Sequence, residues 1–276
     1  MVGVTPHLIH RLWFGPRPMP GLYQDFGARW AELNPGWVVH DWGYDDLPLL
    51  RNQYLFDRCG DTWGGISGAG KQGSAKQVQQ ADIAAYELVE QFGGVYVNCD
   101  LEPLKPLEPL LDEVGVKAFA CVSPDAGFLS NAVLGGPAGH WFWGAVIDFL
   151  PVSVASKPIR AMNKQTGPAL LTEVAERERV WWASGVVDGS ETYRRWGEFA
   201  ALPAAYFNPY GYQEMGREGG VFPDAYAEHH WGHRYLDEVL WPGEPEQVGE
   251  APKWIRDALR QVGDKGLGPR FGSRIS

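Results

Sequence analysis

Short apolar runs and amphipathic stretches alternate along the first part of the chain. Residues 7–14 form an apolar run that ends at Gly15-Pro16, and residues 37–42 form a second one. Both have the length of a buried strand. Between them, residues 20–33 predict a helix from apolar residues at helical spacing, namely Leu22, Phe26, Trp30 and Leu33. The turn residues Asn34-Pro35-Gly36 end this helix. The chain therefore opens strand–helix–strand, which is the start of an α/β fold.

A longer amphipathic stretch follows a loop of glycine, serine and aspartate residues at 58–74. Residues 75–92 repeat apolar side chains at helical spacing and predict a helix that ends at Gly93-Gly94. Residues 95–97 are apolar and predict a strand, and Asn98-Cys99-Asp100 stands at its carboxyl end. Because open α/β sheets bind ligands at the carboxyl ends of their strands, this turn is a candidate site.

The pattern after Asp100 is less regular. We expect the proline-rich segment Leu101–Leu111 to wrap the surface. Further strands are predicted at 117–123 and 131–135, and further helices at 138–150, 168–178 and 251–262. Residues 180–226 are aromatic and irregular and give no clear prediction. Since no linker or repeat is visible, we expect one domain over 1–262 and a flexible tail over 263–276.

Charge and cysteine content narrow the function classes. The net charge of −10 disfavours nucleic acid as a partner, because an acidic protein repels a polyanion. A single nucleotide is still allowed, since a divalent cation can neutralise its diphosphate. Three cysteines without a CxxC pair indicate a reducing compartment and no disulfide framework. No signal peptide and no apolar stretch long enough to span a membrane are visible, so we expect a cytoplasmic protein.

The Asn98-Cys99-Asp100 turn carries two oxygen-bearing side chains at positions i and i+2. In an extended chain these point to the same side, where they can share one cation and a ribose. Sugar transfer from a nucleoside diphosphate needs the charge on the leaving diphosphate to be neutralised, which Mg²⁺ or Mn²⁺ does with few protein ligands. The structural alternative is an Asx-turn that ends the strand.

The residues before this turn carry a resemblance to a known family. Asp82, Ile83 and Tyr86 in the helix, followed by Gly93-Gly94, Tyr96 and Asp100, resemble the pattern of the DXD-motif sugar transferases. That group includes capsular polysaccharide and yeast Golgi mannosyl transferases and the glucosylating clostridial toxins. Its members have a Ser-Asp-Ile-x-Arg-Tyr helix before Gly-Gly-x-Tyr-x-Asp-x-Asp.

Further short segments resemble the same family in the same order, over about residues 7–235. They are Ile9–Gly15, Asn34–Trp37 with Trp42, Asn131-Ala132 with Pro137–His140, Thr166-Gly167-Pro168, and His229-His230-Trp231. Each segment is short, but their common order is hard to obtain by chance.

The resemblance implies a GT-A fold, which is a Rossmann-like α/β fold with a mostly parallel central sheet, and a glycosyltransferase that retains anomeric configuration. It implies a UDP- or GDP-linked sugar as donor, an acceptor that the sequence does not identify, and Mn²⁺ or Mg²⁺ as cofactor. As catalytic residues it implies Asp82 and Asp100. As donor contacts it implies Trp13, Asp82, Asn98, Asp100, Asn131 and Trp231.

For the metal, the resemblance implies Asp100, with Asn98 as a weak ligand and one of His229 and His230 completing the shell. We favour His230 slightly. Trp13 should stack on the nucleobase, and Trp231 should help to cover the donor when the preceding glycine-rich segment closes.

Ordinary structural roles compete with these assignments. Asp82 could be a solvated acid on a helix face, and Trp13 could be core. Asn131 could be a turn residue, and Thr166 could be a helix cap. His229-His230-Trp231 could be a packed aromatic cluster.

The sequence also departs from the family pattern. Asn98 replaces the first acid of the metal motif, Ala85 the usual arginine, and Ala81 the usual serine. An amide oxygen coordinates a metal without adding charge. A non-catalytic sugar-nucleotide-binding relative is therefore the alternative. A glycoside hydrolase using Asp82 and Asp100 is a third class, which would need neither metal nor nucleotide.

Overall fold

The computed structural model describes residues 3–15, 18–59, 75–124, 128–157, 162–180, 194–196, 198–214 and 217–231. Along these residues the strands are β1 (Leu8–Leu12), β2 (Val38–Trp42), β3 (Gly94–Val97), β4 (Leu101–Pro103), β5 (Ala118–Val122), β6 (Leu129–Gly136), β7 (Arg194–Trp196), β8 (Phe199–Leu202) and β9 (Ala227–His229). The helices are α1 (Gly21–Leu33), α2 (Gln53–Asp57), α3 (Ala75–Phe92), α4 (Glu108–Val114), α5 (Trp141–Ser156), α6 (Met162–Gln165) and α7 (Pro168–Arg177).

Seven strands form the central sheet in the order β2-β1-β3-β6-β5-β8-β7. β1 is parallel to both β2 and β3, and β5 is parallel to β8. β6 is antiparallel to both of its neighbours, and β7 is antiparallel to β8. All strands of this sheet except β6 and β7 therefore run in one direction, which confirms the predicted α/β class with a mostly parallel sheet.

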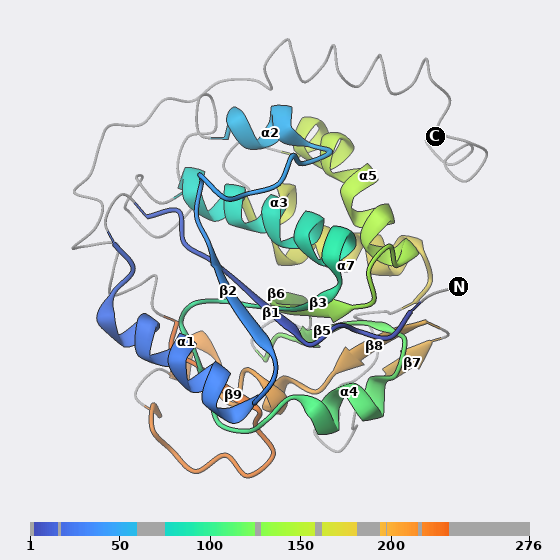
Figure 1. Ribbon diagram of the computed structural model, residues 1–276. Helices are drawn as coiled ribbons and strands as arrows, with labels where there is room; N and C mark the ends of the chain where they lie inside the picture. The colour runs from blue at the N-terminus through green and yellow to red at the C-terminus, as the bar shows by residue number, and fades with distance from the viewer. Residues whose placement is uncertain are drawn as a thin grey trace.

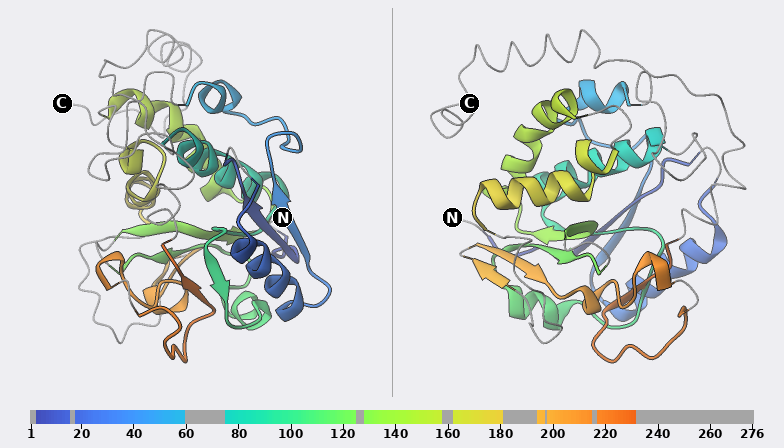
Figure 2. Two further views of the ribbon diagram at one scale, coloured as in Figure 1. Left: turned by 90° about the vertical axis from the view of Figure 1, so that its left-hand side faces the viewer. Right: turned by 180° about the vertical axis from the view of Figure 1, so that it is seen from behind.

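Helices cover both faces of this sheet (Figures 1 and 2). α2, α3, α5 and α7 lie on one face, and α1 and α4 lie on the other with the small β4–β9 ribbon. The strands serve two cores because alternate side chains point to opposite faces. On β3, Val95 and Val97 belong to the core under α1 and α4, whereas Tyr96 belongs to the core under α3 and α5.

The Gly93-Gly94 pair fixes the start of β3. Both residues have positive φ, and a Cβ on Gly94 would strike the Leu8 carbonyl oxygen of the neighbouring strand. His10 holds the same junction, because its Nδ1 accepts from Trp42 Nε1 at 3.0 Å and its Nε2 then donates to the Gly93 carbonyl at 2.7 Å. Burial lowers the pKa of His10 to about 4, so the ring is neutral at physiological pH. The glycines and His10 thus place the turn that follows β3.

The structure confirms the predicted strand–helix–strand opening, the helix at 75–92 and the strand before Asn98. The predictions of a strand within 131–135 and of helices at 138–150 and 168–178 are confirmed too, with shifted ends. The prediction for Leu101–Leu111 was wrong, because this segment contains β4 and the start of α4 and buries Leu101, Leu107 and Leu110. Leu101, Leu107 and Leu110 pack in the core under α1 and α4, whereas the prolines of this segment had suggested a surface position. The predicted helix at 251–262, the tail at 263–276 and most of the loop at 58–74 lie outside the described residues.

Candidate active site

Asp82 is the centre of a buried hydrogen-bond group. Its Oδ1 accepts from Asn131 Nδ2 of β6 at 2.6 Å, and its Oδ2 accepts from Thr166 Oγ1, just before α7, at 2.8 Å. Tyr86, one helical turn further along α3, donates from its hydroxyl to the Thr166 carbonyl at 2.9 Å. Three segments that the sequence analysis singled out separately therefore converge, and Thr166 binds Asp82 instead of capping a helix.

Burial controls the charge of Asp82. Desolvation raises the pKa of this carboxyl to about 7, and the hydrogen bonds from Thr166 and Asn131 oppose that rise. The residue is 9% exposed, so it is not the solvated helix-face acid that the sequence left open. A carboxyl group with a pKa near neutrality can hold or release a proton under working conditions.

Asp100 and His229 form a second centre. Asp100 lies three residues beyond the last residue of β3, at the carboxyl end of that strand, as predicted. His229 ends β9, which pairs with β4, and its Nε2 lies 3.3 Å from Asp100 Oδ1. Both side chains are buried, with residue exposures of 9% for Asp100 and 4% for His229.

Asn208 fixes the orientation and tautomer of the His229 ring. Its Nδ2 donates to the sulfur of Cys121, so its Oδ1 is the atom that faces His229 Nδ1, at 2.9 Å. His229 Nδ1 must therefore carry the proton, and Nε2 of the neutral ring presents a lone pair. Among the described residues this buried Nε2 has no hydrogen-bond partner, and the nearby atom is a carboxylate oxygen of Asp100. Two acceptors at this distance repel each other unless a cation or a proton lies between them.

Asn98 takes part in a different contact. Tyr96 donates from its hydroxyl to Asn98 Oδ1 at 2.9 Å, and the two side chains lie on the same side of the chain because they are two residues apart. The amide oxygen thus already accepts one hydrogen bond from the protein, and the Nδ2 group can donate to a ligand. Of the two roles expected from the sequence, this geometry suits a ribose contact better than metal ligation.

Trp13 lines a cavity of about 560 Å³ between α1 and the end of β2. The indole is partly exposed, and it packs against the small buried cluster of Tyr23, Phe26 and Cys99. Other walls come from Gln24 and Gly27 of α1 and from Asp41 and Trp42 of β2. The cavity thus combines two indole rings with one carboxylate and one amide.

Two tyrosines connect these three places. Tyr23 makes an edge contact with Trp13, with ring centroids 6.1 Å apart. Burial raises the pKa of Tyr23, and the Asp100 charge adds to that rise. Burial is likewise the main cause that raises the pKa of Tyr96, and the charges of both Asp82 and Asp100 contribute. The cavity at Trp13, the Asp100–His229 pair and the Asp82 group are therefore parts of one neighbourhood.

The remaining predicted residues lie beside His229. His230 directs its Nε2 to Glu102 Oε2 at 2.9 Å. Trp231 stacks on the His229 ring, with centroids 4.1 Å apart and an angle of 27° between the planes. Of the two histidines offered as metal ligands by the sequence, His229 is the one whose ring meets Asp100.

Asn208, Glu102 and Glu228 were not singled out by sequence reasoning. Asn208 lies in the irregular stretch 180–226, which has no clear pattern, and no local signal connects it with His229. Glu102 is two residues beyond Asp100, and Glu228 precedes the His-His-Trp segment, so their positions in the chain were the only available signal.

Neither protein-family models nor curated proteins give a match to the chain. Among solved structures, the PaToxG glycosyltransferase is similar with a TM-score of 0.48 and 14% identity, over 63% of this chain and 69% of that one. The UDP-bound glycosyltransferase domain of the YGT toxin has a TM-score of 0.46 and 11% identity, over 94% and 89% of the two chains. An active-site mutant of LgtC has a TM-score of 0.40 and 9% identity, over 96% and 98%. These values are too low to carry a function from those proteins to this one.

Proposed function

We propose that the protein is a retaining, metal-assisted glycosyltransferase that uses a nucleoside-diphosphate sugar. The observation that carries the proposal is the Asp100–His229 pair, in which an imidazole nitrogen without a hydrogen-bond partner in the described part of the chain lies 3.3 Å from a carboxylate oxygen. Retention of configuration and a UDP- or GDP-linked donor are implied by the family resemblance alone. No helix in the described part of the chain is long and apolar enough to cross a membrane.

The pair suits a divalent cation better than it suits an empty protein contact. Neutral imidazole and carboxylate are both ligands for Mn²⁺, and a metal-binding histidine commonly donates its other nitrogen to a fixed acceptor, as His229 does to Asn208. Asp100 and His229 would hold the ion, which would neutralise charge on the leaving diphosphate when bound. Water and the phosphates supply the other ligands of such an ion.

Asp82 is suited to hold a hydroxyl of the donor sugar. Each of its oxygens accepts one hydrogen bond from the protein, and a carboxylate oxygen has a second lone pair. Asn131 and Thr166 keep the carboxyl group in one orientation, so it can position a sugar ring at little entropic cost. In this proposal Asp82 orients the sugar while Asp100 lies at the diphosphate.

The cavity at Trp13 is suited to the nucleobase. Its volume of about 560 Å³ falls within the range of ligand pockets, and the face of an indole ring can stack on any of the nucleobases. The Asp41 carboxylate on its wall accepts hydrogen bonds, as the N–H groups on the pairing edges of uracil and guanine require.

A catalytically weakened binding protein is the second candidate. The hydrogen bond from Tyr96 to Asn98 favours it, because it engages the amide oxygen that would otherwise replace the missing acid of the metal motif. Such a protein would bind the donor without turning it over.

A thermal-shift screen with UDP, GDP and their sugars, each with and without Mn²⁺, tests the proposal. A ligand that binds only the native state raises the melting temperature, so we expect a rise that needs both nucleotide and Mn²⁺. Asp100→Ala should abolish the metal-dependent part. Release of nucleoside diphosphate from the donor that binds best then separates an enzyme from a binding protein. If no nucleotide or sugar nucleotide shifts the melting temperature, both candidates fail.

A further inference from the structure

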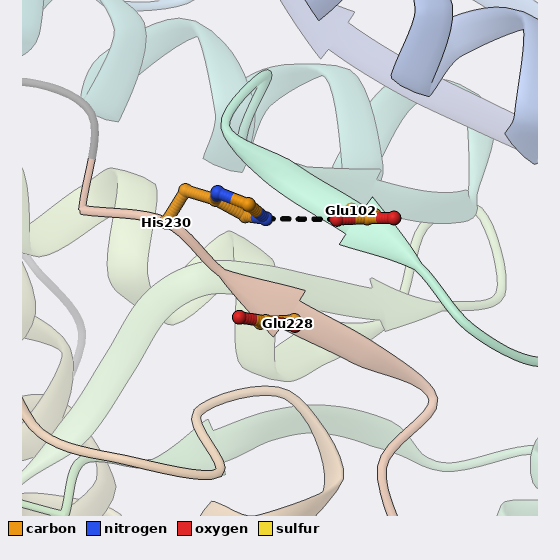
Figure 3. Close-up of side chains that lie close together, drawn as sticks. All are labelled: Glu102, Glu228 and His230. Atoms are coloured by element: carbon orange, nitrogen blue, oxygen red, sulfur yellow. Dashed lines mark hydrogen bonds and ion pairs between the residues drawn. The ribbon is translucent and has the colours of Figure 1, made fainter. Parts of the chain in front are cut away.

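The β4–β9 ribbon carries a group of metal-ligating side chains that the proposed transfer site does not use. Glu102 lies directly opposite Glu228 in the antiparallel register, and His230 follows Glu228 by two positions. Side chains opposite each other, or two apart along a strand, share one face, so these three gather on one side of the ribbon. Figure 3 shows them together over the two strands. His229 belongs to the alternate set and meets Asp100 instead.

The three side chains lie at ligand-sharing distance. One donor atom from each of Glu102, Glu228 and His230 lies within 4.8 Å of the other two. His230 Nε2 is 2.9 Å from Glu102 Oε2. A metal ion with tetrahedral ligands at about 2.0–2.2 Å holds its ligand atoms roughly 3.3–3.6 Å apart, so small side-chain movements would bring the three donor atoms to one ion.

Glu228 is built into this position. It is 2% exposed, and its Oε1 accepts from the Tyr210 hydroxyl at 3.0 Å and from the Gly219 amide at 2.8 Å. These bonds fix the carboxylate, and among the described residues its hydrogen bonds leave Oε2 to act as a ligand. A buried carboxylate held rigidly beside a second one is costly unless positive charge is close.

The described residues supply little positive charge here. Among them, no lysine or arginine forms an ion pair with Glu228. Arg29 reaches Glu102, but through the other oxygen, Oε1, at 3.8 Å, and its side chain is about half exposed. Within the group, His230 is the side chain that carries a positive charge when it is protonated. When it is neutral, its ring is a metal ligand.

We propose that Glu102, Glu228 and His230 bind a divalent transition-metal ion, at a site separate from the Asp100–His229 pair. Two carboxylates and one imidazole suit Zn²⁺, Co²⁺ and Mn²⁺ and give three protein ligands, with water completing the shell. An ion at this site cross-links β4 to β9. Because the His230 amide also donates to the Asp100 carbonyl at 3.0 Å, the cross-link holds His229 beside Asp100. The site is therefore structural, and it positions the neighbouring donor site.

Titration of nucleotide-free protein with Co²⁺, followed by visible absorption, tests this site without any donor. We expect one high-affinity equivalent, displaced by Zn²⁺, in the parent and in Asp100→Ala. Glu102→Gln and His230→Gln should weaken binding at least tenfold, because each removes one of three ligands. Glu108→Gln, a carboxylate on the surface of α4, is the matched control and should bind as the parent does.

Glu228→Gln is expected to fold poorly because its carboxylate is buried, so the partly exposed Glu102 and His230 provide the decisive variants. The proposal is overturned if the parent binds no Co²⁺, or if Glu102→Gln and His230→Gln bind it as tightly as the parent. It is also overturned if Asp100→Ala alone loses the ion, because the ion then belongs to the donor site. None of these outcomes depends on transfer activity, so failure here leaves the proposed function standing.

Discussion

Asn131 Nδ2 and Asp82 Oδ1 lie 2.6 Å apart, although 49 residues separate them in the chain. The bond joins α3 to β6, the strand that runs against its neighbours in the sheet. It connects two short motifs whose relation the sequence alone did not reveal. It also orients a buried carboxylate toward the proposed donor, which makes Asp82 a sensitive probe of the site.

Asp82→Asn should flatten the pH dependence of stability. The pKa of Asp82 is raised from 3.8 to about 7 in the folded protein, so folding favours its protonated form. The stability that the protonated carboxyl contributes is complete below pH 3.8 and falls as the pH rises toward 7. Above about pH 7 this contribution is gone and stability no longer changes with the ionisation of Asp82. The free energy of unfolding lost between these pH values is on the order of 4 kcal/mol at most. Urea unfolding at several pH values measures it. Asp112→Asn, an exposed acid of α4, should keep the parent's pH profile, and an unchanged profile in Asp82→Asn would contradict the assignment.

His229→Gln should lower donor turnover more than His230→Gln does. The His229 ring meets Asp100, whereas His230 meets Glu102, so only the first change removes a ligand of the proposed donor metal. We expect a loss of about tenfold or more for His229→Gln at saturating Mn²⁺, in line with the loss of one metal ligand or its support. Steady-state release of nucleoside diphosphate is the measurement. If His230→Gln has the larger effect, the sequence-based preference for His230 is restored.

Trp13→Ala should weaken nucleotide binding by about one to two orders of magnitude, because stacking of a base on an aromatic ring contributes roughly 1–3 kcal/mol. Calorimetric titration with UDP or GDP in Mn²⁺ measures the change. Trp37→Ala is the control, since that indole stacks on His7 outside the cavity. Equal affinities for the two variants would mean that the base lies elsewhere.

Asn98→Asp should strengthen Mn²⁺-dependent donor binding, because it restores a negative charge close to Asp100. The Tyr96 hydroxyl can donate to the new carboxylate as it does to the amide oxygen. Tyr96→Phe removes that donor and serves as the comparison, since it frees the Asn98 oxygen without adding charge. The measurement is the donor affinity of each variant at several Mn²⁺ concentrations. Weaker binding by Asn98→Asp would place the metal away from this turn.

Much of the fold is encoded locally. The helix at 75–92 has the predicted bounds, because apolar side chains at helical spacing define it and Gly93-Gly94 ends it. The strand after it was predicted at 95–97 and spans Gly94–Val97 in the structure. Because this apolar run ends at Val97, the turn with Asp100 lies at its carboxyl end. Periodicity and turn chemistry depend on neighbours in the sequence, and this is why they can be read there.

The arrangement of the candidate site could not be predicted from local patterns, because it depends on contacts between residues far apart in the chain. Whether His229 or His230 faces Asp100 is decided by the register of β9 on β4, and a shift of one residue would exchange the two faces. The partnership of His229 with Asn208 joins residues 21 positions apart through an irregular segment. The amino-acid sequence determined which side chains are available for chemistry and where the strand before Asp100 ends. Only tertiary packing decided which of them meet, because pairing across the β4–β9 ribbon and burial between layers are properties of the whole fold.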